Sequence, residues 1–134
     1  MSRSGYSDDY DDDQWASIRW RGAVKSAIRG KRGQAFLREL LAALDAMPTK
    51  RLISDELRQP DGEVCALGSI GVARGIELES LDPHDYDKLA ETFGISSRLV
   101  QEIEWENDDA WGSRQTPEQR FQHVREWVVE QIKV

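Results

Sequence analysis

The sequence predicts a mainly α-helical protein, a compact bundle of five to six short helices with at most a small β-hairpin near residues 51–66. Apolar residues recur every three to four positions over most of the chain, which is the period of one face of a helix. Capping residues, prolines and glycines separate these periodic segments. With 134 residues and no internal repeat, the chain is most simply one helical domain over 14–134, preceded by a disordered acidic tail over 1–13.

The first two expected helices follow one another closely. An apolar face develops from Trp15 onward, and Trp15 and Ile18 widen it. Gly30 and Gly33 then interrupt the pattern, and a second helix with a leucine-rich stripe follows and ends at Pro48. Because so short a turn joins the two helices, we expect them to pack as an antiparallel hairpin.

The middle of the chain has the weakest helical pattern. The stretch "QPDG" consists of residues typical of a β-turn, which favours a small hairpin. Residues 63–74 could form a strand or a helix, and their apolar spacing favours a short helix from about Val64 to Arg74 that stops at Gly75. Three glycines weaken this helix, unless a neighbouring helix passes close to them.

Three more helices are expected toward the C-terminus, each with a start signal. Asp82 and Pro83 begin one that runs to Gly94. Ser96 or Ser97 caps the next helix. The last opens with a capping box of Thr116 and Gln119, and Pro117 is its first helical residue.

Charge is distributed unevenly along the chain. Residues 14–38 carry +7 with no acidic residue and the remainder carries −14, which together give the net charge of −7. Lysines and arginines on one helical face, together with a tryptophan in a loop, are the candidate partner-binding residues: Arg21, Lys25, Arg29, Arg32 and Trp111. In the alternative interpretation the basic face is solvated and pairs with the acidic segment 102–109, and Trp111 folds back over the last helix.

Residues 89–105 have the spacing of a DNA-reading helix pair. This stretch resembles a repressor-type helix-turn-helix. The small residue of the first helix is Ala90, the glycine of the turn is Gly94, and the two apolar residues of the second helix are Val100 and Ile103. If the helix pair at 84–106 reads DNA, the residues that would do so are Ser96, Ser97, Arg98 and Gln101. Residues 96–109 sum to −4, however, which would be repelled by phosphates. The spacing therefore favours a packing unit over a DNA reader.

The sequence indicates no enzyme. His84 and His123 have no second histidine or cysteine at metal-ligand spacing, and Cys65 has no base near it in sequence. The many carboxylates fit solvated helix faces. We therefore expect no catalytic residue, no metal site and no cofactor.

Membrane attachment and export are not expected either. No apolar run approaches the roughly 20 residues of a membrane helix, and the polar N-terminus lacks the apolar core of a signal peptide. The single cysteine gives no sign of an oxidising compartment. We expect a cytoplasmic protein, and its oligomeric state stays open.

Three longer runs and the short motif "END" carry a wider resemblance: "RWRGAVKSAIRGKRGQAFLRELLAALDAMP", "DGEVCALGSIGVARG" and "TPEQRFQHVREWV". In these runs the chain resembles a group of small bacteriophage and prophage proteins. The resemblance covers nearly everything after residue 18. It implies a bacterial cytoplasm during infection or lysogeny, and assigns no site residue.

The expected function is that of a non-enzymatic accessory protein. It would bind a host or phage protein, or a protein–nucleic-acid assembly. Inhibition of a host defence protein is one form that this function could take. A helix-turn-helix DNA-binding regulator and a structural virion component are the alternatives.

Overall fold

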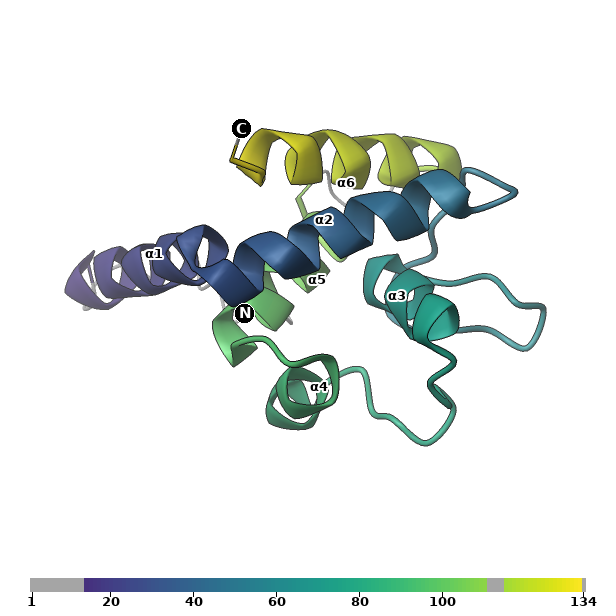
Figure 1. Ribbon diagram of the computed structural model, residues 1–134, viewed down its shortest axis with the longest axis horizontal. Coiled ribbons are helices and arrows are strands. Elements are labelled where there is room, and N and C mark those ends of the chain that lie inside the picture. Colours follow the sequence, from purple (N-terminus) through teal and green to yellow (C-terminus); the bar gives the residue numbers. More distant parts are fainter. Residues whose placement is uncertain (1–13, 111–114, 134) are drawn as a thin grey trace.

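The computed structural model describes residues 14–110 and 115–133, which form six α-helices and no β-strand (Figure 1). The helices are α1 (Gln14–Arg29), α2 (Lys31–Ala46), α3 (Ala66–Arg74), α4 (Tyr86–Phe93), α5 (Ser97–Asp108) and α6 (Pro117–Gln131). The predicted helical bundle is therefore confirmed. Of the hairpin near 51–66, a single antiparallel bridge remains, between Arg58 and Val64. The predicted tail over 1–13 and Trp111 lie outside the described residues.

Helix α5 is the centre of the bundle. It packs against α1, α3, α4 and α6, and α2 packs against α1, α3 and α6. In Figure 1, α6 lies along one side of α2, and α3 and α4 lie on the other. Because neighbours surround α5, its apolar residues Leu99, Val100 and Ile103 are almost completely buried.

The leucine stripe of α2 forms the core, as its helical spacing predicts. Leu37, Leu40 and Leu44 recur three and four residues apart and have no exposed surface. Each of the other elements adds large buried side chains to the same core, among them Leu52, Leu67, Ile70, Leu89, Phe93 and Val124. One continuous apolar core therefore connects all parts of the fold.

The prediction that α1 and α2 form an antiparallel hairpin is wrong. In Figure 1, α2 leads away from the end of α1 instead of folding back along it, and α1 packs against α5. The two helices are joined by Gly30 alone, in an extended conformation (φ −68°, ψ 162°), which is too short a link to reverse the chain. A Cβ at Gly33 would collide with the carbonyl oxygen of Ala27, so glycine lets α2 begin directly against the end of α1.

Most of the predicted helix ends are confirmed. Gly75 and Gly94 end α3 and α4 in the left-handed conformation, at φ 72° and 74°. Thr116 caps α6 in the expected capping box. The start of α4 differs, because Asp85 is its cap and accepts a hydrogen bond from the amide of Lys88.

The non-helical segment before α3 is held by one buried side chain of α5. Nδ2 of Asn107 donates to the carbonyl of Ile53 at 2.8 Å, and its Oδ1 accepts from the amide of Ala66 at 3.0 Å. Arg120 of α6 also donates to the carbonyl of Leu52 at 3.0 Å. Side chains of α5 and α6 therefore add to the backbone hydrogen bonds within this segment, among them the one from the amide of Ile53 to the carbonyl of Val64 at 2.9 Å.

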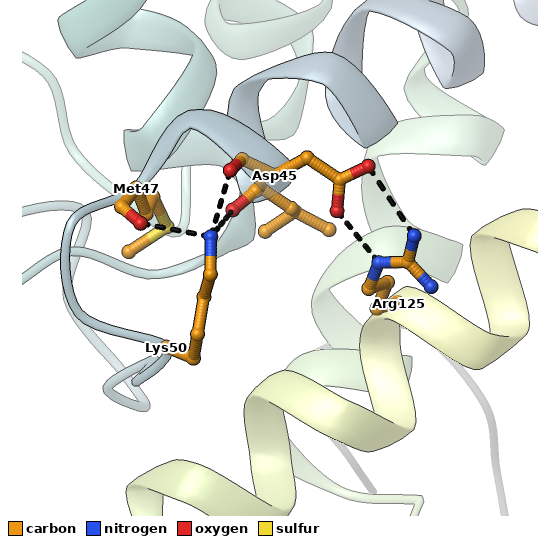
Figure 2. A network of polar contacts seen from close by, with 5 residues as sticks. Asp45, Met47, Lys50 and Arg125 are labelled. Atoms are coloured by element: carbon orange, nitrogen blue, oxygen red, sulfur yellow. Dashed lines mark hydrogen bonds and ion pairs between the residues drawn. The ribbon is translucent and has the colours of Figure 1, made fainter.

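Lys50 closes the C-terminal end of α2. Its ammonium donates to the carbonyl oxygens of Leu44, Asp45 and Met47, at 3.2, 2.7 and 2.8 Å (Figure 2). A cation at a helix C-terminus satisfies its unpaired carbonyls and opposes the negative end of the helix dipole. The Asp45 carboxylate accepts two hydrogen bonds from Arg125, which links α2 to α6 (Figure 2).

Candidate interaction surface

A basic surface runs along α1 into the first turn of α2. Arg21, Lys25 and Arg29 follow one another at intervals of four residues, which places them on one side of α1, and Arg32 follows in α2. Six exposed side chains form what we call the basic surface: Arg19, Arg21, Lys25, Arg29, Lys31 and Arg32. It contains all four cations that the sequence proposed as partner-binding residues.

Within residues 14–110 and 115–133, no cation of the basic surface forms an ion pair. Other arginines do, since Arg74 contacts Glu39 and Arg125 contacts Asp45, each at 2.7 Å. The pairing with segment 102–109 that the sequence left open is not formed among these residues. The charge of the basic surface therefore faces solvent.

The free end of α1 also exposes large apolar side chains. Trp15 is 71% exposed and Ile18 is 44% exposed, whereas Val24 and Ile28 are buried against the rest of the fold. The sequence-based prediction that Trp15 and Ile18 widen the core-facing side is therefore wrong. At about 100° per residue, Trp15 lies on the side of α1 opposite Val24. This end of the helix extends beyond the neighbours that could cover it (Figure 1).

The residues that a DNA-reading helix would use lie at the start of α5. Ser96 caps this helix by accepting from the amide of Leu99 at 3.2 Å, and Ser97 and Gln101 are partly buried. The Arg98 guanidinium lies 4.4 Å from the centre of the Trp20 ring in α1, a cation–π contact. Arg98 is the only exposed residue of α5, which is therefore a core helix over most of its surface.

The acidic residues of α5 are buried, so the prediction of solvated carboxylates is wrong for this helix. Glu102, Glu104, Glu106 and Asp108 are each less than a tenth exposed. The cause is tertiary, because α1, α3, α4 and α6 all pack against α5 and only Arg98 of this helix stays exposed.

Glu106 and His123 form a partly buried link between α5 and α6. Nε2 of His123 lies 2.8 Å from Oε1 of Glu106. Burial, and next the charge of Glu102, raise the pKa of Glu106 to about 8, and burial lowers the pKa of His123. Both shifts disfavour the charged forms, so burial opposes a full ion pair between Glu106 and His123.

The cysteine and the possible metal ligands are the remaining candidates for a chemical site. Cys65 is buried at the start of α3, where its sulfur accepts from the amide of Gly68 at 3.4 Å. Among the described residues, no group of three or more His, Cys, Asp or Glu side chains is arranged to hold a metal ion. In the same part of the chain, no helix has the length and apolar character needed to cross a membrane.

A pocket between α2 and α3 is a site that sequence reasoning missed. It is an open pocket of about 680 Å³, lined by the C-terminal end of α2, by residues 48–49 and 61–64, and by α3. These segments are separated in the chain and share no motif. The only sequence signal is the apolar Val72, which lies on the outer side of α3 and is half-exposed.

The chain matches no protein-family model, no curated protein and no solved structure. Its own surfaces are therefore the guide to its function.

Proposed function

We propose that this chain is a non-enzymatic binding protein that docks onto an acidic surface of a partner protein through its basic surface. The observation that carries the proposal is the set of six exposed cations with no ion pair to another described residue. Such a field speeds association with a partner of opposite charge and suppresses association with basic proteins.

The exposed end of α1 supplies the apolar part of this interface. Binding energy at protein interfaces is concentrated in a few side chains, with Trp and Arg enriched among them. Trp15 lies one helical turn from Arg19, and Ile18 lies beside both. A helix of 16 residues is about 24 Å long, so α1 offers an extended surface to a partner.

The resemblance to small bacteriophage and prophage proteins supplies the proposed context. In this proposal the protein acts in the bacterial cytoplasm during infection or lysogeny. Its partner is a host or phage protein, and inhibition of host defence is one such role. Mass spectrometry of purified virus particles would separate this function from that of a structural virion component.

A matched pair of lysine substitutions tests the proposal. Lys25 and Lys88 are both exposed and unpaired within the described residues, but only Lys25 belongs to the basic surface. The tagged chain is incubated with nuclease-treated host lysate at low and at high salt, and captured proteins are identified. We expect Lys25→Glu to reduce capture of the partner and Lys88→Glu to leave it unchanged. Equal capture by both variants, or no captured protein at low salt in several hosts, would contradict the proposal.

Binding of DNA is the second candidate, and one observation favours it. Because α1 packs against α5, the basic surface and Arg98 lie on neighbouring helices. Weighing against it, a recognition helix needs a free face to enter a groove, and α5 exposes one residue. A gel shift with the phage's own intergenic DNA across salt concentrations separates the two, because phosphate contacts make affinity fall steeply with salt.

A further inference from the structure

The pocket between α2 and α3 has the size and the lining of a binding site. Ligand pockets enclose roughly 300–1,000 Å³ and are mainly apolar with a few polar groups. This one is an open pocket of about 680 Å³, with small apolar side chains over most of its wall. Val72 of α3 lies in it and is 51% exposed. The space fits one or two large side chains and not a whole helix.

The charged residues of the pocket are acidic. They are Asp61 and Glu63, and no lysine or arginine belongs to the lining. Glu63 lies 3.3 Å from Nε of Arg51, but Asp61 forms no ion pair within the described residues. The adjacent Lys50 is turned toward the carbonyl oxygens at the end of α2 (Figure 2). A group that fits is therefore apolar with a positive charge beside it.

The chain itself carries such a group at the free end of α1, where Trp15 and Ile18 are exposed beside Arg19. In Figure 1, α1 extends from one end of the molecule, whereas α3 and the C-terminal end of α2, which line the pocket, lie toward the other end, so the free end of α1 does not reach the pocket of its own chain. We propose that the exposed side chains at the free end of α1 of one copy dock into the pocket between α2 and α3 of a second copy. Trp15 and Ile18 pack against Val72, and Arg19 lies beside Asp61.

This contact joins two different surfaces of the same chain. A reciprocal exchange of α1 closes a pair of copies, whereas a one-way contact repeats into a longer chain. The inference rests on the proposed function, because α1 makes both the contact with a second copy and the contact with a foreign partner protein. Self-association and binding of the foreign partner therefore compete. A monomeric protein would overturn the self-docking and leave binding to a foreign partner standing.

Sedimentation velocity of the purified full chain over a concentration series tests the proposal. We expect the mass to rise with concentration, and to rise less at high salt because the contact is partly ionic. Trp15→Ala and Val72→Asp should each weaken self-association by roughly tenfold or more, as loss of an interface anchor does. Val129 of α6 is 46% exposed and lies outside the pocket lining, so Val129→Asp is the matched control and should change nothing.

A charge exchange shows whether the two surfaces meet. Arg19→Glu and Asp61→Arg should each weaken self-association, and a mixture of the two variants should restore it. A mass of one chain at every concentration would overturn the proposal. An equal effect of Val72→Asp and Val129→Asp, or no recovery in the mixture, would do the same.

Discussion

Replacing Glu106 by glutamine is expected to stabilise the protein at alkaline pH and to have little effect at acidic pH. Burial and the neighbouring Glu102 raise the pKa of Glu106 from its ordinary value of 4.5 to about 8. Between these two values the folded protein binds more protons than the unfolded chain does. The contribution of Glu106 to stability is therefore full below pH 4.5, falls as the pH rises, and is lost above about pH 8.

The size of this effect follows from the two pKa values. Each pH unit between them is worth about 1.4 kcal/mol, so the whole interval sets an upper limit of about 5 kcal/mol. The side chain of Glu106 keeps 9% of its surface exposed, so contact with water reduces the cost of ionising it. We therefore expect Glu106→Gln to gain about 2–3 kcal/mol relative to wild type between pH 5 and pH 9.

Urea unfolding of both proteins at several pH values measures this difference. Burial lowers the pKa of His123, so the folded state also loses stability as the pH falls below the ordinary value of 6.5. That loss occurs in both proteins and largely cancels from their difference. Glu91→Gln, at an exposed carboxylate of α4, is the control for the loss of one surface carboxylate. A pH-independent difference between Glu106→Gln and wild type would refute the reasoning.

Four further substitutions test the fold and the helix pair. Leu40→Ala should cost about 2–5 kcal/mol in urea unfolding, because the side chain is fully buried; an unchanged midpoint would place it outside the core. Asn107→Ala should cost about 2–4 kcal/mol, since two backbone groups of the segment 51–66 lose their partner, and limited proteolysis should then cut this segment first. Gly94→Val should lower the melting temperature, because a β-branched residue is strained at φ 74°. Arg98→Ala should change stability by no more than about 1 kcal/mol; loss of DNA binding with unchanged melting would instead favour the DNA-reading alternative.

The sequence by itself determined the helices and most of their ends. The stripe of Leu37, Leu40 and Leu44 and the capping box at Thr116 depend on contacts within a few residues. The same holds for the left-handed glycine that ends α4. Such contacts are local, so spacing and residue type are sufficient to predict them.

The sequence also indicated the cations of the basic surface, because their spacing is helical. It did not indicate that they face solvent without ion pairs to other described residues, or that Trp15 and Ile18 are exposed. Helical spacing says which residues share a side of α1, but not how far its neighbours reach along it. The extent to which α5 covers α1 was decided by tertiary packing.

The largest differences lie where tertiary structure alone decides the environment. The link at Gly30 allows α2 to leave α1 in several directions, and packing on α3 and α6 selects one of them. The acidic pattern of α5 is typical of a solvated helix, and it is buried because four helices enclose α5. The pocket between α2 and α3 arises from segments that meet only in the folded chain. Burial is a property of contacts between distant residues, whereas periodicity and capping are properties of neighbours.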